Sequence, residues 1–222
     1  MTLPANFDSE NLDNIISDWM CALQEFNVEA LLVLGPNPFG ASQDREVLAL
    51  HPPGLVEAAQ ALACSQDFGA AWRESDAPLV AWQDISKSAW DDLGRWRRLW
   101  MGHGYQSMVR VAFPTTGGRS FECYLFSSRL WHNRSEAALL AWSALNLWPL
   151  LKRALGEARS PLSRRELECL KLAFEGMTAR QTGESLACSE RTVNFHLANA
   201  MAKLKVDNKL AAIQRACWFG LI

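Results

Sequence analysis

The sequence predicts an α+β protein in which an N-terminal α-β-α sandwich with an antiparallel sheet is followed by a small C-terminal four-helix bundle. Three observations lead to this fold class. The chain of 222 residues is long enough for two domains. Strand-like and helix-like apolar patterns alternate up to residue 157, and only helical patterns follow. Between them, residues 158–163 are short, polar and interrupted by Pro161, so we expect domains at 1–157 and 164–222 joined by this linker.

The N-terminal elements follow from the spacing of apolar residues. Helical spacing predicts helices over 11–26, 54–66, 86–102 and 136–157. Short apolar runs predict strands over 30–35, 46–50, 107–113 and 119–126. The last two strands are separated by Gly117-Gly118, a tight-turn sequence, so the sheet should be antiparallel with amphipathic helices on its faces.

The C-terminal segment predicts four short helices over 163–175, 178–186, 189–204 and 208–219. Gly176 is typical of a helix C-terminus, and Thr178 with Gln181 forms a capping box. Ser189 is a good N-cap for the third helix. The connection between the second and third helices is as short as a helix-turn-helix requires, so this motif is predicted inside the bundle.

The third of these helices has one apolar and one polar face. Its apolar stripe recurs at helical spacing, over Val193, Leu197, Met201 and Leu204. The other positions carry side chains that can hydrogen-bond base edges or phosphates: Arg191, Asn194, Asn199, Lys203 and Lys205. Phe195 and Ala198 point the same way and add apolar contact, to a thymine methyl or a sugar. The alternative interpretation is an ordinary solvated face on a helical bundle.

The distribution of charge agrees with a polyanionic partner for the C-terminal part. Up to Glu157 the chain has 12 basic and 18 acidic residues, a net charge of −6, and beyond it 10 basic and 6 acidic residues, a net charge of +4. A basic C-terminal module suits a nucleic acid, whereas the acidic N-terminal part does not.

Enzyme, metal and membrane functions find no support in the sequence. The six cysteines and four histidines are scattered, without a metal-binding spacing, a catalytic triad order or a phosphate-binding loop. We expect no catalytic residues, no metal, no cofactor, and reduced, mostly buried thiols. No run is long enough for a membrane span and no secretory signal is present, so a cytoplasmic location is expected.

The C-terminal residues resemble the DNA-binding module of the LuxR family, the GerE-type helix-turn-helix, from about Leu162 to Ile222. The resemblance is carried by Leu162-Ser-Arg-Arg-Glu166, Ser189-Glu-Arg-Thr-Val-Asn-Phe-His196 and Lys203-Leu-Lys-Val206 followed by Asn208-Lys209. It implies phosphate contacts from Thr192 and His196 and a last helix used for dimer contacts. One departure is Thr182-Gly183, where the family usually has Ile-Ala; we expect both changes to weaken the second helix.

The N-terminal part more distantly resembles the acyl-homoserine-lactone-binding domain of LuxR quorum-sensing regulators. Asp67 falls where the family has the carboxylate that binds the ligand amide, Trp82 at its lactone-side tryptophan, and His103-Gly104 at a helix end. As alternatives, Asp67 is a helix cap or turn residue and most of the ten tryptophans, including Trp142 and Trp148, are core residues.

The positions at which the chain departs from this ligand-binding pattern bear more on function than the positions at which it matches. Gly54 and Ala58 occupy the positions of the family's pocket Trp and Tyr, which donate hydrogen bonds to the ligand carbonyls. Trp100 and Met108 stand where the family has small residues. The resemblance therefore implies a site at Asp67, Trp82, Trp100 and Met108 with a different small-molecule signal, or no ligand.

Taken together, the sequence predicts a homodimeric LuxR-type regulator of transcription that binds double-stranded DNA, with an N-terminal sensory and dimerisation domain. Its expected DNA contacts are Ser189, Arg191, Thr192, Asn194, His196, Asn199, Lys203 and Lys205. The alternative is an anti-activator that forms inactive heterodimers with a related LuxR-type regulator and needs little DNA binding of its own. An enzyme with a helical appendage is a more remote alternative.

Overall fold

The computed structural model describes residues 11–37, 44–65, 77–87, 94–115, 119–131, 133–218 and 220–222. The chain divides into two compact units, Met1–Pro149 and Leu150–Ile222. The division lies inside one long helix, α5 (Arg134–Arg159), which carries a proline at 149 and includes the first two residues of the expected linker.

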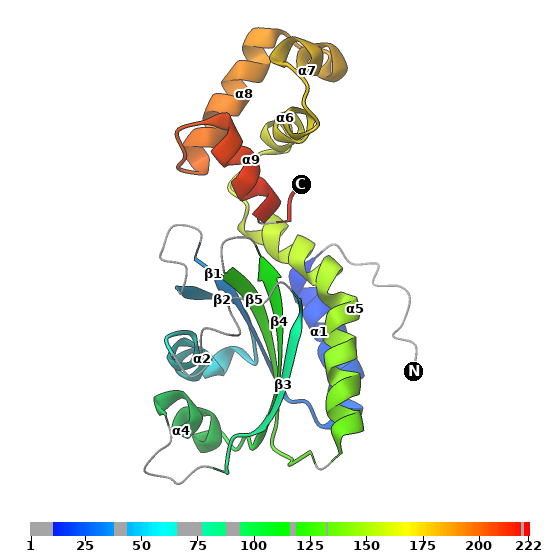
Figure 1. Ribbon diagram of the computed structural model, residues 1–222, viewed down its shortest axis with the longest axis vertical. Helices are drawn as coiled ribbons and strands as arrows, with labels where there is room; N and C mark the ends of the chain where they lie inside the picture. The colour runs from blue at the N-terminus through cyan, green and yellow to red at the C-terminus, as the bar shows by residue number, and fades with distance from the viewer. Residues whose placement is uncertain are drawn as a thin grey trace. The chain divides into compact units, whose positions relative to one another are not determined.

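The first unit is built on a five-stranded antiparallel sheet in the order β2-β1-β5-β4-β3 (Figure 1). Its strands are β1 (Ala30–Pro36), β2 (Arg45–His51), β3 (Leu79–Asp84), β4 (Ser107–Thr115) and β5 (Arg119–Ser127). The central strands β1, β4 and β5 are mostly buried, as expected for strands covered on both faces. The α-β-α sandwich and the antiparallel sheet are therefore confirmed.

Helices cover both faces of this sheet (Figure 1). On one side lie α1 (Leu12–Leu23), followed by the 3₁₀ turn η1 (Gln24–Phe26), and α5. On the other side lie the 3₁₀ turn η2 (Pro53–Leu55), α2 (Val56–Ala63) and α4 (Arg95–Gly102). We call these the α1/α5 face and the α2/α4 face.

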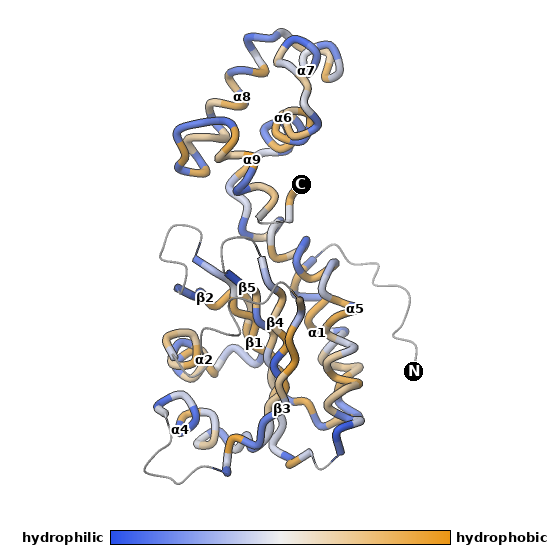
Figure 2. The backbone as a smooth tube through the Cα atoms, viewed as in Figure 1, coloured by the Kyte–Doolittle hydropathy of each residue, from blue (hydrophilic) through white to orange (hydrophobic). Residues whose placement is uncertain are grey.

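The core of the unit lies in the two layers between helices and sheet, and much of the sheet is accordingly hydrophobic (Figure 2). On the α1/α5 side, Trp19 is fully buried and its indole Nε1 donates a 2.7 Å hydrogen bond to Ser143 Oγ. On the α2/α4 side, Leu62, Trp96 and Trp100 pack on Met108 and Phe126. This second layer lies where the family resemblance placed a ligand.

The second unit contains the four expected helices: α6 (Arg164–Phe174), α7 (Ala179–Leu186), α8 (Glu190–Lys203) and α9 (Lys209–Trp218). Gly176 follows α6 with a φ of 87°, a backbone conformation that favours glycine. The capping box of Thr178 and Gln181 is present at the start of α7, and Ser163 with Glu166 forms a second one at α6. These caps explain why the helix boundaries could be predicted closely.

Three expectations about the first unit were wrong or incomplete. Strand β3 was not predicted, since its half-buried residues at the sheet edge lack a strong apolar alternation. Trp142, expected in the core, is 62% exposed on α5, whereas Trp148 stacks on Phe113 of β4. The expected helix over 86–102 begins, within the described residues, only at Arg95. The Gly117-Gly118 turn lies outside the described residues.

Candidate nucleic-acid interface

The orientation of α8 is fixed by its N-cap and by one buried stripe. Ser189 Oγ accepts a 3.1 Å hydrogen bond from the backbone N–H of Thr192, which satisfies one of the free donors at the helix start. Val193, Leu197 and Leu204 are buried among residues of α6 and α9. Met201 is only partly buried against them, and Ala200 completes the stripe. The remaining surface of α8 consequently faces away from the core of the unit.

The outward surface has two flanks. Arg191, Asn194 and Ala198, at i, i+3 and i+7, form one flank, and all three are exposed. The second flank lies on the other side of the outward surface and contains Thr192, His196, Asn199 and Lys203, which also recur at helical spacing. The first three of these residues are partly buried, and Lys203 is exposed. Both flanks offer hydrogen-bond donors of the kinds that contact bases and phosphates.

Three of the expected DNA contacts, Ser189, Thr192 and Lys203, already have side-chain partners inside the protein. Lys203 Nζ donates a 2.8 Å hydrogen bond to Glu166 Oε2, whose side chain is only 5% exposed. Ser189 Oγ is engaged with the backbone and with Thr192 Oγ1, 2.8 Å away. Lys203 thus ties the end of α8 to the start of α6, a stabilising role that sequence spacing could not reveal. Lys205 is exposed just beyond the helix, with a positive φ of 52°.

The Glu166 carboxyl is held in its ionised form by this arrangement. Burial acts to raise its pKa, but hydrogen bonds from Lys203 and from the backbone and side chain of Ser163 outweigh burial, so the pKa is lowered. Glu166 also accepts a 2.7 Å hydrogen bond from the backbone N–H of Ser163. One carboxylate therefore links the N-cap of α6 to the C-terminal end of α8.

Gly183 has a role opposite to the expected weakening. An ideal Cβ at this position would lie only 2.7 Å from the carbonyl oxygen of Cys188, in the turn that leads to α8. Real Cβ atoms do not approach backbone this closely, so in this chain the glycine permits α7 and the turn to pack together. The neighbouring Thr182 is buried. The expectation that Gly183 simply costs packing and entropy is therefore corrected.

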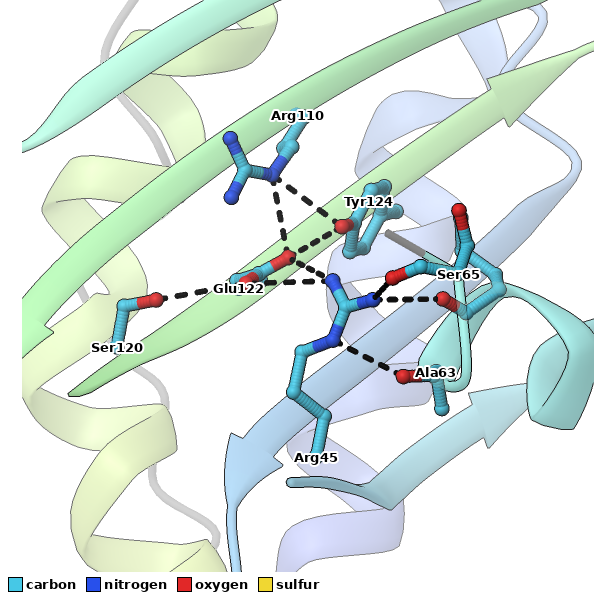
Figure 3. Close-up of polar contacts among 8 residues, drawn as sticks. Arg45, Ala63, Ser65, Arg110, Ser120, Glu122 and Tyr124 are labelled. Atoms are coloured by element: carbon cyan, nitrogen blue, oxygen red, sulfur yellow. Dashed lines mark hydrogen bonds and ion pairs between the residues drawn. The ribbon is translucent and has the colours of Figure 1, made fainter. Parts of the chain in front are cut away.

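A buried polar network, which sequence reasoning missed, crosses the α2/α4 face (Figure 3). Glu122 of β5 receives hydrogen bonds from Arg110 Nε at 3.1 Å and Arg45 Nη1 at 3.2 Å, and from the hydroxyl of Tyr124. The Glu122 and Arg110 side chains are 3% and 1% exposed. Arg45 also donates to the carbonyl oxygens of three residues at the end of α2: Leu62, Ala63 and Ser65. The network thus fastens β2 and α2 to the centre of the sheet.

Charge compensation keeps Glu122 ionised in this buried position. Burial raises its pKa, but Arg110 and Arg45 lower it by more, so the net shift is downward. The pKa of the Tyr124 hydroxyl is raised well above its ordinary value by burial and by the adjacent Glu122 carboxylate. An uncompensated charge here would be costly, so the three charged residues depend on one another.

The residues expected to bind a ligand do not all lie on the same face of the sheet. Trp100 and Met108 both lie fully buried on the α2/α4 face. Trp82 pairs with Val109, the residue after Met108, so its side chain lies on the α1/α5 face. Its Nε1 is buried and has no hydrogen-bond partner among the described residues. Asp67 lies outside the described residues.

Gly54 and Ala58, which replace the two ligand donors of the related family, have different surroundings. At Gly54, which is exposed, an added Cβ would meet no atom within 4 Å. Ala58 is fully buried, and its carbonyl oxygen accepts a 3.2 Å hydrogen bond from Trp100 Nε1. The Trp100 ring stacks on Phe126 with centroids 3.6 Å apart. A side chain of the protein therefore occupies space beside Ala58.

Other expectations concern thiols, metals and membranes. All six cysteines are free; Cys123 and Cys169 are buried, but Cys21 and Cys64 are exposed, contrary to the expectation that most would be buried. Among the described residues, no cluster of His, Cys, Asp or Glu side chains could hold a metal ion. None of the described helices is both long and apolar enough to cross a lipid bilayer.

Fold and site together define a chain of two compact units, the second of which contains a helix-turn-helix formed by α7 and α8. Residues 160–216 match the model of the bacterial regulatory proteins, luxR family. This match covers α6, α7, α8 and most of α9, so the helix-turn-helix part of the second unit is similar to this family of bacterial regulators.

Curated proteins similar to this chain are named as transcriptional activators. The transcriptional activator protein SolR of Ralstonia nicotianae is 32% identical over 162 residues, which is 67% of this chain and 65% of SolR. The transcriptional activator protein LuxR of Aliivibrio fischeri is 37% identical over 91 residues, 41% of this chain and 36% of that protein. The chain thus spans less than two thirds of the length of each of these two relatives.

One solved structure supports the fold. SdiA in complex with octanoyl-rac-glycerol has a TM-score of 0.50 and 19% sequence identity, covering 95% of this chain and 89% of that one. A crystal structure of Escherichia coli SdiA covers 96% and 93% at 22% identity, with a TM-score of 0.47. The mixed α+β architecture is shared with the SdiA complex.

Proposed function

We propose that this protein is a transcriptional regulator that binds specific double-stranded DNA as a homodimer, in the cytoplasm, with α8 in the major groove. The observation that carries the proposal is the outward surface of α8, where Arg191 and Asn194 are exposed in a luxR-family module. Their side chains can donate to purine base edges, and helices of this kind dock in the major groove. The basic residues of the second unit supply phosphate contacts that strengthen binding.

The test of DNA binding uses the purified full-length protein alone. Selection from a random DNA library should enrich a site with two related half-sites about one helical turn apart, because a dimer presents two recognition helices. Affinity for this site should fall steeply with salt concentration. If the protein alone enriches no sequence, the proposal fails. Enrichment only after a related LuxR-type regulator is added would support the heterodimer alternative instead.

A surface on α5 supports self-association. Leu139 and Trp142, at i and i+3, are 44% and 62% exposed on the side of α5 turned away from the sheet. A third apolar side chain, Leu210 at the start of α9, is 75% exposed in the other unit. A single helix-turn-helix buries little surface on DNA, so pairing is needed for tight binding. We therefore assign a second copy of the chain to the Leu139 and Trp142 surface.

The substitution Trp142→Glu tests this assignment. It should convert dimers to monomers in sedimentation and reduce affinity for the selected site, while leaving the melting temperature nearly unchanged because the side chain is exposed. Val56→Glu is the matched control, since Val56 is a 51% exposed apolar residue on α2. Equal sedimentation of both variants as dimers would refute the α5 surface.

We also propose that ordinary acyl-homoserine lactones are not the signal. The buried Trp100, hydrogen-bonded to Ala58 and stacked on Phe126, supports this proposal, as does the absence of ligand donors at Gly54 and Ala58. A ligand carbonyl buried without a donor costs about 1–3 kcal/mol. The protein expressed without lactone should be folded, and short, long and aromatic lactones should not raise its melting temperature. A shift of several degrees at micromolar lactone would overturn this part of the proposal.

Octanoyl-rac-glycerol belongs in the same thermal assay, because SdiA was solved with this molecule. A rise in melting temperature with octanoyl-glycerol but not with lactones would indicate a different ligand. No rise with any of these compounds would support a regulator that folds without a ligand.

A further inference from the structure

Phe195 is the aromatic residue at the centre of the outward surface of α8. Its side chain is 62% exposed, although burial of an aromatic ring is favourable. Arg191 precedes it by four residues, and Ala198 and Ala202 follow at i+3 and i+7, so these four share one exposed face. The two alanines are small, and the ring therefore projects beyond them on this face.

The position of the ring between the two polar flanks restricts what it can contact. Arg191 and Asn194 lie on one flank, and Thr192 and Asn199 lie on the other. His196 contacts the ring edge, with centroids 6.0 Å apart and planes at 61°. If the flanks engage bases and phosphates, the ring between them must face the floor of the groove. The apolar group exposed there is the C5-methyl of thymine.

We propose that Phe195 is a specificity-determining residue that reads a thymine methyl group in the operator. This inference rests on the proposed DNA binding and adds a chemical requirement to it. Arg191 and Asn194 would supply hydrogen bonds to neighbouring base edges, whereas Phe195 would select thymine at one position of each half-site by apolar contact. Contact with a deoxyribose would also bury the ring but would not depend on the methyl group.

The experiment replaces single thymines of the selected site by deoxyuridine, which removes only the C5-methyl. At one position in a half-site, this replacement should weaken binding of the wild-type protein about fourfold, the ratio expected for one buried methyl group. Phe195→Ala should bind the thymine site more weakly and should not distinguish thymine from deoxyuridine. Phe195→Leu, which remains apolar, should retain part of the discrimination.

Phe174→Ala is the matched control, because Phe174 is 58% exposed in the same unit but lies at the end of α6. It should discriminate thymine from deoxyuridine as the wild type does. If no deoxyuridine position affects the wild type, or if Phe195→Ala shows the same loss as the wild type, the inference is wrong even though DNA binding stands. If no site can be selected at all, the proposed function itself fails.

Discussion

The indole nitrogen of Trp100 donates a 3.2 Å hydrogen bond to the carbonyl oxygen of Ala58 and so joins α4 to α2. The same ring stacks on Phe126, with an interplanar angle of 5°, and joins both helices to β5. One side chain therefore connects three elements of the α2/α4 layer. It does so beside Ala58, one of the two positions where the related family has a ligand donor and this chain has none.

Trp100→Ala should destabilise the first unit by about 3–5 kcal/mol, because it removes a fully buried ring and leaves a cavity. Trp100→Phe keeps a ring but loses the hydrogen bond and some volume, and should cost less. Urea unfolding followed by tryptophan fluorescence measures both. If Trp100→Ala were as stable as the wild type, Trp100 would not be the centre of this layer.

Glu122→Gln should destabilise the protein by about 3–5 kcal/mol, because it leaves the buried Arg110 guanidinium without its counter-charge. Glu136→Gln is the control: Glu136 pairs with Arg129 at 2.9 Å, but the side chains of Arg129 and Glu136 are 40% and 27% exposed, so loss of this pair should cost under about 1 kcal/mol. Equal effects in denaturant titrations would contradict the role of burial.

Gly183→Ala should destabilise the second unit, by about 1–3 kcal/mol, because the added Cβ would collide with the Cys188 carbonyl. Helix propensity alone predicts the opposite sign, a gain of about 1 kcal/mol. Gly102→Ala is the control, since a Cβ there meets no atom within 4 Å, and it should be neutral or stabilising. Thermal unfolding by circular dichroism decides between the two signs.

The Glu166 and Lys203 pair predicts a pH dependence. Because the folded-state pKa of Glu166 lies below its ordinary value of 4.5, its stabilising contribution is present above pH 4.5 and is lost as the pH falls through the folded-state pKa. Glu166→Gln should lower stability at neutral pH and flatten the decline on acidification. An unchanged decline in thermal unfolding between pH 6 and pH 3 would show that other carboxyl groups dominate.

Sequence patterns predicted most of the fold because its signals are local. Ser189, Gly176 and Thr178 with Gln181 mark helix ends within three or four residues, and the structure confirms each of them. The network around Glu122 escaped prediction because its members come from β2, β4 and β5, and only the sheet register brings them together. In the sequence, charged residues such as Arg110 and Glu122 within a strand predict a solvent-exposed face, whereas in the structure both side chains are buried.

The candidate site shows the same division between local and long-range information. The exposure of Arg191 and Asn194 follows from helical spacing around Val193, and the structure agrees. The pairing of Lys203 with Glu166 joins residues 37 positions apart, and no local pattern contains it. The same holds for Trp82, whose face is set by its register with Val109.

The most direct test of the account measures the affinity of purified full-length protein for its selected DNA site, with Arg191→Ala and Asn194→Ala compared with the wild type. Both side chains are exposed on α8, so both variants should keep the wild-type melting temperature. Each should lose about 1–3 kcal/mol of binding free energy, roughly 5- to 150-fold in affinity, and should relax base preference at one position per half-site. Wild-type affinity and base preference in both variants would contradict the assignment of this helix face to DNA.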